Sequence, residues 1–217
     1  MCFICLNCQL DIDIEKSKII LNNLIAEKHN NLDSTVLAAS ESLDKLISAC
    51  VNCKVKREKL ANPSIYSPLS NHTSFYYYGT DHLITDLIHY IKNGIKNNEL
   101  IYISMMDELN NQLLETLKEL KIPTSNIHFN DITELILIHK CSSLKGLKEK
   151  LQLDENEALS NGFIGIRWVV QPYFMVTEPL KRDFSAWKKD LDEALNHRKT
   201  YFLCVYDFND YLNENYD

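Results

Sequence analysis

The sequence predicts an α/β protein: a mostly parallel sheet covered by helices, preceded by an antiparallel helical hairpin at the N-terminus. Three observations predict this class. From residue 72 onward, apolar segments of strand length alternate with amphipathic segments of helix length. Before residue 54, apolar residues recur twice at helical spacing. Between these parts lie Pro63 and Pro68, which a helix does not accommodate. We therefore divide the chain into a helical hairpin over 1–59, a linker over 60–71 and a second module over 72–217.

Composition indicates a folded, mildly acidic protein. The 217 residues carry a net charge of −7, which argues against nucleic acid as the main partner. No apolar run reaches the roughly 18 residues of a membrane span, and no secretory signal is visible at the N-terminus. We therefore expect no membrane partner. The seven cysteines, an odd number in a chain without a signal, predict a reducing, cytoplasmic location.

The first predicted helix runs from Ile14 to about Lys28. The segment "HNNLDS" interrupts the pattern, and Asp33 or Ser34 can cap a second helix. The apolar residues of that second helix are Val36, Leu37, Ala39, Leu43, Leu46 and Ile47. Two helices of about 16 residues with a short connection form an antiparallel hairpin. Such a pair buries little surface, so we expect a metal clamp, a partner protein or a second copy in a homodimer.

The cysteine spacing suggests a clamp. Cys5 and Cys8 form one C-x-x-C pair before the first helix, and Cys50 and Cys53 form another at the end of the second. These ends are adjacent in an antiparallel hairpin, so the four thiolates could ligate one structural zinc ion. Cys2 extends the first pair to a spacing also used by iron–sulfur clusters, and free thiols are the remaining alternative.

The stretch "LNNLIAEKHNNLDSTVLAASESLDKLI" resembles the stage-zero sporulation E-type aspartyl-phosphate phosphatases. Their second helix carries Ser-Gln-Glu-Leu-Asp between a Val-Leu pair and a Leu-Ile pair. The matching residues here are Val36, Leu37, Ser40, Leu43, Asp44, Leu46 and Ile47. The resemblance covers about residues 12–53. It implies binding to a phosphorylated response regulator, the sporulation master regulator, and faster loss of its aspartyl phosphate.

Two positions depart from that pattern: Glu41 replaces Gln, and Ser42 replaces Glu. A neutral amide can orient an attacking water, whereas a carboxylate repels the phosphoryl group unless the Mg²⁺ of the partner regulator offsets it. The candidate catalytic residues are Asp44, Glu41 and Ser40, with Asp44 positioning water or metal. Alternatively, these side chains are the solvated stripe of an amphipathic helix.

The second module is predicted element by element. The strands are expected at 74–78, 99–105, 127–131, 162–170 and 201–208, and the helices at 81–94, 107–120, 141–159 and 178–198. Gly94 is placed at the C-cap of the first of these helices and Pro179 in the first turn of the last. Apolar strands that alternate with helices imply a mostly parallel sheet with both faces covered.

The turn after the first strand decides between catalysis and binding. An NTPase would carry a phosphate loop there, but "YYGTDHLI" has one glycine and no Gly-Lys-Ser/Thr. Asp81 would also repel a bound anion. We therefore do not expect ATP hydrolysis.

Three stretches, "HTSFYYYGTDHLITDLIHYIKNGIKNNELIYIS", "GFIGIRWVV" and "FLCVYDF", resemble the MEDS sensory domain, named for methanogen, methylotroph and DcmR proteins. They span about residues 71–210. Because that domain is related to KaiC-like ATPases, the resemblance implies a RecA/KaiC-like fold. It also implies ligand sensing without catalysis, with small hydrocarbon derivatives as the suspected ligands.

Aromatic residues with one arginine and one aspartate at strand ends suit a small, partly apolar ligand with a polar head. The candidate ligand-binding residues are His72, Tyr76, Tyr78, His82, Arg167, Tyr206 and Asp207. Structural alternatives are a core position for Tyr76 and Tyr78 and an ion pair between Arg167 and Asp207. Cys141 and Cys204 are expected to be buried small side chains.

Taken together, these patterns predict an intracellular signalling regulator of the sporulation phosphorelay. A small-ligand sensor would control binding or dephosphorylation of a phosphorylated response regulator. Two other classes stay open: a non-catalytic adaptor that sequesters its partner, which Glu41 favours, and a metal- or redox-sensing switch, which the cysteines favour.

Overall fold

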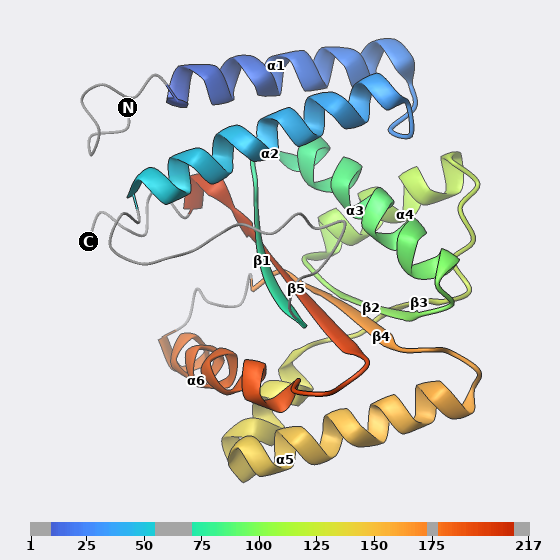
Figure 1. The fold of residues 1–217 in the computed structure, drawn as a ribbon, viewed down its shortest axis with the longest axis vertical. Coiled ribbons are helices and arrows are strands. Elements are labelled where there is room, and N and C mark those ends of the chain that lie inside the picture. The colour runs from blue at the N-terminus through green and yellow to red at the C-terminus, as the bar shows by residue number, and fades with distance from the viewer. Residues whose placement is uncertain (1–9, 55–70, 173–177, 211–217) are drawn as a thin grey trace.

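The computed structural model describes residues 10–54, 71–172 and 178–210 (Figure 1). Its helices are α1 (Leu10–Lys28), α2 (Ser34–Lys54), α3 (Thr80–Lys96), α4 (Asp107–Glu119), α5 (Thr133–Ser160) and α6 (Glu178–Ala194). Its strands are β1 (His72–Tyr77), β2 (Leu100–Ser104), β3 (Ile127–Phe129), β4 (Ile166–Val170) and β5 (Thr200–Asp207). Nearly all of the predicted linker lies outside the described residues.

The five strands form one sheet in the order β1-β5-β4-β2-β3, and every pairing is parallel. Every residue of the central strand β4 is buried, which explains why its sequence is apolar except for Arg167. In β1, by contrast, buried and half-buried residues alternate. The prediction of a parallel sheet covered by helices is confirmed.

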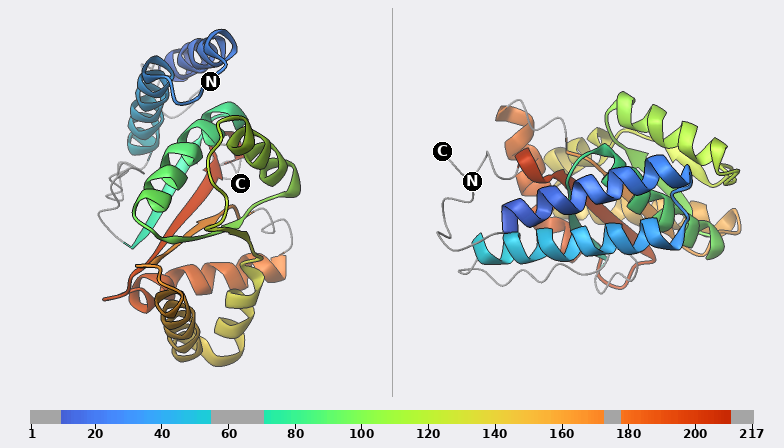
Figure 2. Two further views of the ribbon diagram at one scale, coloured as in Figure 1. Left: turned by 90° about the vertical axis from the view of Figure 1, so that its right-hand side faces the viewer. Right: turned by 90° about the horizontal axis from the view of Figure 1, so that it is seen from above.

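Helices cover both faces of the sheet (Figures 1 and 2). The α3 and α4 side is filled by aliphatic side chains such as Leu87 and Leu113, which pack on Ile103 of β2. The α5 and α6 side is more aromatic, with Trp187 in edge contact with Phe202. α1 and α2 lie outside α3 and form a further layer.

α1 and α2, hereafter the helix pair, pack side by side. Asp33 caps α2: its carboxylate accepts a hydrogen bond of 2.8 Å from the Thr35 N–H. The buried apolar side chains between the two helices are Ile14, Leu21, Val36, Leu43 and Ile47. The same cluster continues into the second module through Phe208 of the segment after β5.

Several predicted boundaries are wrong. Gly94 is not a C-cap, because α3 continues to Lys96. Its small size instead allows close packing, since a Cβ there would lie 3.0 Å from Arg167 Cδ. α5 begins at Thr133 rather than 141, and Ser143 interrupts it with a φ of 54°. His72 is the first residue of β1 and does not precede the strand.

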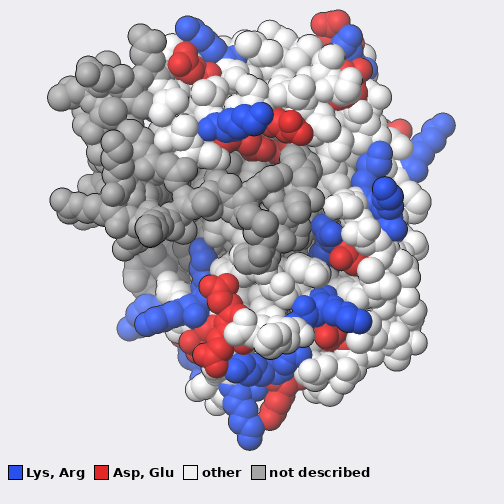
Figure 3. Space-filling model, in the orientation of Figure 1, with Lys and Arg blue, Asp and Glu red and all other residues white. Residues whose placement is uncertain are grey.

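The surface carries both signs of charge. On the face shown in Figure 3, basic and acidic side chains are interspersed, as is usual for a solvated surface. Within the ranges that the structure describes, no helix combines the length and apolar character needed to cross a membrane.

Candidate functional site

The carboxyl ends of β1 and β5 lie beneath the helix pair. In a parallel sheet, this edge is where ligands bind. Tyr76, Tyr78 and Phe208 lie at this edge and pack against the apolar cluster between α1 and α2. The helix pair therefore covers the carboxyl end of two neighbouring strands.

Four of the predicted ligand-binding residues are brought to this edge. Tyr76 and Tyr206 are paired in register and stack with ring centroids 5.5 Å apart. Tyr78 donates a hydrogen bond of 2.8 Å to Glu15 of α1. Asp207, the last residue of β5, accepts a bond of 2.8 Å from the Asn209 N–H. These four residues therefore lie together, as an aromatic and acidic group, at the carboxyl end of the sheet.

Arg167 lies elsewhere. It is near the amino end of β4, where it is buried and its Nε donates to the carboxylate of Glu99. Its guanidinium also lies 4.7 Å from the ring centroid of Tyr90. The alternative pairing of Arg167 with Asp207 is therefore wrong, because parallel strands place the two residues at opposite ends of the sheet.

His72 also lies at the amino end, beside α6. Its Nδ1 is 3.0 Å from Asp192 Oδ1, and its Nε2 is 3.5 Å from the thiol of Cys204. Burial lowers the pKa of His72, and the nearby charge of Asp192 only partly offsets this. Burial raises the pKa of the Cys204 thiol to about 11. The thiol of Cys204 therefore stays protonated at physiological pH, which does not suit a nucleophile.

His82 occupies the position where a phosphate loop would lie. α3 starts at Thr80, directly after Gly79, whose φ of 86° only glycine adopts easily. The ring of His82 folds back, and its Nδ1 accepts a hydrogen bond of 3.0 Å from the Tyr78 N–H. A side chain in the first turn thus satisfies a backbone donor just before the helix, much as in a capping box.

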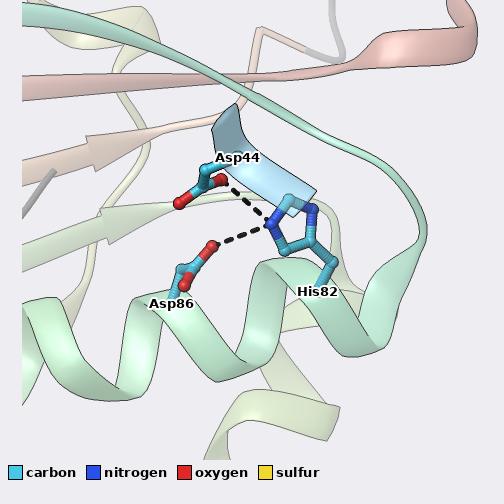
Figure 4. Close-up of side chains that lie close together, drawn as sticks. All are labelled: Asp44, His82 and Asp86. Carbon is cyan, nitrogen blue, oxygen red and sulfur yellow. Dashed lines mark hydrogen bonds and ion pairs between the residues drawn. The ribbon is translucent and has the colours of Figure 1, made fainter. Parts of the chain in front are cut away.

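The other ring nitrogen of His82 faces two carboxylates (Figure 4). Nε2 lies 3.0 Å from Asp44 Oδ1 of α2 and 3.1 Å from Asp86 Oδ2 of α3. Ser40 of α2 donates a hydrogen bond of 2.8 Å to Asp86 Oδ1. We call Ser40, Asp44, His82 and Asp86 the clasp. It joins the helix pair to the second module.

The clasp fixes the orientation of the residues predicted to be catalytic. Ser40 is fully buried against α3, and the Asp44 side chain is only 23% exposed. Glu41 is half-buried next to them. The face of α2 that carries the phosphatase-like residues therefore points toward the sheet domain instead of forming a solvated stripe.

Burial and charge alter the acidity of the clasp. Burial raises the pKa of Asp44 to about 6, and the charge of Asp86 adds to the shift. Burial alone would lower the pKa of His82, but Asp86 and Asp44 outweigh it and raise the pKa to about 9. The carboxyl group of Asp44 therefore holds its proton more tightly in the clasp than it would in water. The Tyr78 N–H, which donates to Nδ1, opposes a second proton on the ring of His82.

A metal ion is the obvious alternative, because one donor atom each from Asp44, His82 and Asp86 lies within 4.8 Å of the others. The hydrogen bond from Tyr78 argues against it. A metal-bound histidine donates its second N–H to an acceptor, whereas Nδ1 of His82 here faces the Tyr78 N–H donor. The proton of the ring is therefore on Nε2, directed at the carboxylates. The geometry defines a hydrogen-bonded clasp and not a metal centre.

The clasp belongs to a longer polar interface. His82, Thr85, Asp86 and His89 recur at the spacing of one helical face along α3. Asn31, in the connection between α1 and α2, donates a hydrogen bond of 2.8 Å to Thr85. His89 lies 3.2 Å from the Asn31 carbonyl. An interface of this kind resembles those between separable domains.

The sequence reasoning missed Asp86. The available signal was its spacing of four residues from His82, which places both on one helical face, within a segment rich in buried leucine and isoleucine. The predictions for two further cysteines have different outcomes. Cys204 is buried as expected, but Cys141 is exposed. Its expected burial is wrong.

The predicted cysteine clamp falls largely outside the described residues. Cys5 and Cys8 precede the described part of the chain, and the side chain of Cys53 is not described. Cys50 is fully buried within the apolar cluster of the helix pair. The metal site stays a prediction.

The chain contains an α/β domain with an all-parallel sheet, and a histidine in the first turn of α3, next to the end of β1, accepts a hydrogen bond from the Tyr78 N–H. A family model described as MEDS, the methanogen/methylotroph, DcmR sensory domain, matches residues 71–215. The chain therefore belongs to the MEDS family. The match begins at the start of β1, and the helix pair precedes it. No curated protein and no solved structure matches the chain.

Proposed function

We propose that the chain is a signalling regulator in which the MEDS domain controls access to the Ser40 and Asp44 face of α2. One observation carries this proposal. The two residues are held by the MEDS domain itself, Ser40 by Asp86 at 2.8 Å and Asp44 by His82 at 3.0 Å. As long as the clasp is closed, another protein cannot contact Ser40.

The position of the helix pair explains how a ligand would act. Tyr76 and Tyr206 stack at the carboxyl edge of the sheet, and Tyr78 bonds to Glu15 of α1. A small, partly apolar ligand bound at this edge would displace side chains that also hold the helix pair. Ligand binding and release of α2 would then be coupled, because a ligand shifts an equilibrium by its different affinity for the two states.

The partner that fits the exposed α2 face is an aspartyl-phosphorylated response regulator of a sporulation phosphorelay. The support is the resemblance of Ser40, Leu43 and Asp44 to the phosphatase motif. Once released, Asp44 would position water or the regulator's Mg²⁺ beside the phosphoryl group. Glu41 adds a second negative charge there and would slow the reaction.

The test is the half-life of a phosphorylated regulator incubated with the full chain. We expect wild type to shorten the half-life, Asp44→Ala to remove most of this effect, and Glu41→Gln to strengthen it. Glu27→Gln is the matched control for Glu41→Gln, because Glu27 is an exposed acid on α1. The half-life of the phosphorylated regulator with Glu27→Gln should equal its half-life with wild type.

A non-catalytic adaptor is the second candidate, and Glu41 is the observation that favours it. If wild type and Glu41→Gln bind the regulator but leave its half-life unchanged, the helix pair is a docking element. Catalysis would then be excluded, whereas control of access by the MEDS domain would still hold.

A further inference from the structure

Lys188 of α6 carries a half-buried amine that faces the end of the sheet formed by β1 and β5. Its Nζ lies 2.5 Å from the hydroxyl oxygen of Tyr206 on β5 and 4.5 Å from the centroid of that ring. Tyr206 in turn stacks on Tyr76 of the edge strand β1. The amine therefore lies beside an aromatic pair that belongs to the predicted ligand-binding residues.

Within the described part of the chain, no carboxylate forms an ion pair with Lys188. Asp192, one turn further along α6, is directed at His72, whose Nδ1 lies 3.0 Å from Asp192 Oδ1. A lysine that is partly removed from water without a paired carboxylate loses its proton more easily than an exposed lysine.

The polar groups of β5 near Lys188 are protonated and neutral. Burial raises the pKa of the Tyr206 hydroxyl, and it raises the pKa of the Cys204 thiol to about 11. Burial also lowers the pKa of the Lys188 amine, and the charges of Cys204 and Asp192 only partly offset this. The neutral amine is the form that attacks carbonyl groups, and its electron pair can accept the Tyr206 O–H.

We propose that Lys188 captures a small, apolar aldehyde as a Schiff base, and that Tyr206 supplies the proton for the loss of water. The stacked rings of Tyr76 and Tyr206 form an apolar wall that suits a hydrocarbon chain. The inference names the chemical class of the ligand in the function proposed above. It rests on that function only for the effect of the ligand on α2, because capture at Lys188 needs no partner protein.

The reaction is a condensation that balances without an oxidant or a reductant. The electron pair of Lys188 Nζ forms a bond to the carbonyl carbon, and the carbonyl oxygen takes up a proton from the attacking nitrogen. Tyr206 then protonates the resulting hydroxyl, which leaves as water while the carbon–nitrogen double bond forms. The Tyr206 phenolate takes the remaining proton from the nitrogen. One aldehyde is bound, one water is released, and Tyr206 returns to its starting state.

The experiment traps the Schiff base in the full chain at neutral pH. Butanal is the probe, and sodium cyanoborohydride reduces the imine to a stable butyl-lysine. Fragmentation mass spectrometry measures the initial rate of labelling at each lysine. Lys189, the next residue, is exposed and serves as the internal control. Lys188 should be labelled about tenfold faster than Lys189.

Tyr206→Phe is the decisive variant, because it keeps the ring beside Tyr76 and removes only the hydroxyl. The rate at Lys188 should fall about tenfold or more, while the rate at Lys189 stays the same. Tyr201→Phe is the matched control, since Tyr201 lies on the same strand but on the opposite face of the sheet. Its rate at Lys188 should equal that of wild type. Circular dichroism verifies that both variants are folded.

Asp192→Asn should change the rate in the opposite direction. It removes a negative charge that favours the ammonium form of Lys188, while an asparagine oxygen can still face His72 Nδ1. The rate at Lys188 should therefore rise about twofold. Glu193→Gln is the control, because the neighbouring Glu193 is exposed and its carboxylate accepts a hydrogen bond from Lys148. It should leave the rate unchanged.

Equal rates at Lys188 and Lys189 in wild type would overturn the proposal and show that Lys188 only packs its stem on Tyr206. An unchanged rate in Tyr206→Phe would overturn the role assigned to the phenol. The trapping assay contains no regulator, so it is independent of the proposed function. If Lys188 is labelled as predicted, but labelled and unlabelled chains give the phosphorylated regulator the same half-life, the Schiff base stands and control of α2 by this ligand is wrong.

Discussion

His82 connects the two parts of the chain because its two ring nitrogens face different elements. Nδ1 accepts from the backbone of Tyr78 at the start of α3, and Nε2 contacts Asp44 of α2. The first contact orients the ring, and the second uses that orientation to hold the helix pair. A residue predicted to bind a ligand thus has a linking role in the structure.

Arg167 was predicted as a ligand-binding residue, but its contacts are those of a buried ion pair with Glu99. Arg167→Met should lower the free energy of unfolding by about 3–5 kcal/mol, because it leaves the Glu99 carboxylate buried without its cation. Urea denaturation measures this loss. The double variant with Glu99→Leu should recover much of it. Equal stability of Arg167→Met and wild type would show that the pair is not structural.

At the scale of elements, α2 has two faces that contact different parts of the protein. Its buried side, including Leu43, packs in the apolar cluster with α1, and its Ser40 side contacts α3. A substitution on the first side should affect folding, and one on the second should affect docking.

Leu43→Ala should therefore reduce the free energy of unfolding by about 2–5 kcal/mol, because Leu43 is fully buried. The neighbouring change Ser42→Ala is the control, since Ser42 is exposed and should alter stability by less than about 0.5 kcal/mol. Chemical denaturation followed by circular dichroism compares the two. Equal stabilities would contradict the described packing of α2.

Gly165 permits the close approach of β4 to β5. A Cβ at this position would lie 2.5 Å from the backbone oxygen of Lys199, which has no freedom to move away. Gly165→Ala should cost about 1–3 kcal/mol of stability by overpacking. Ile164→Ala, at an adjacent position that is 54% exposed, is the control. Thermal unfolding of both variants tests this prediction. It is wrong if Gly165→Ala has the same melting temperature as wild type.

The sequence predicted the strands and most helices because their apolar spacing is a local signal. The sequence-based prediction failed where the conformation or role of a residue depends on contacts with residues distant in the sequence. Gly94 looked like a helix end, but its role depends on Arg167 from a distant strand. The Ser143 interruption of α5 has no comparable sequence signal. Asp86 was missed because its meaning appears only when α2 brings Ser40 beside it.

At the scale of the molecule, the helix pair covers the edge at which a parallel sheet binds ligands. The apolar contacts of Phe208 and the polar contacts of α3 hold it there together. The chain belongs to the MEDS sensory family, and in the function proposed above this arrangement would connect a ligand at the carboxyl end of the sheet to the α2 surface.

The central claim is that the MEDS domain covers the partner-binding face of α2. The most direct test places a bulky side chain in the interface between α3 and the helix pair. Thr85 is fully buried on α3 opposite Asn31, so Thr85→Arg should force the helix pair away without changing any residue of α2. The measurement is the affinity of the full chain for the phosphorylated regulator. The matched control is Gln112→Arg, an exposed position on α4.

Thr85→Arg should bind the regulator about tenfold more tightly than wild type or more, a gain of about 1.4 kcal/mol, while Gln112→Arg should bind like wild type. Energy transfer between fluorophores at the exposed positions Ala38 of α2 and Lys96 of α3 verifies that Thr85→Arg has released the helix pair. If the released variant binds no more tightly than wild type, the MEDS domain does not mask the partner-binding face of α2, and the central claim is wrong.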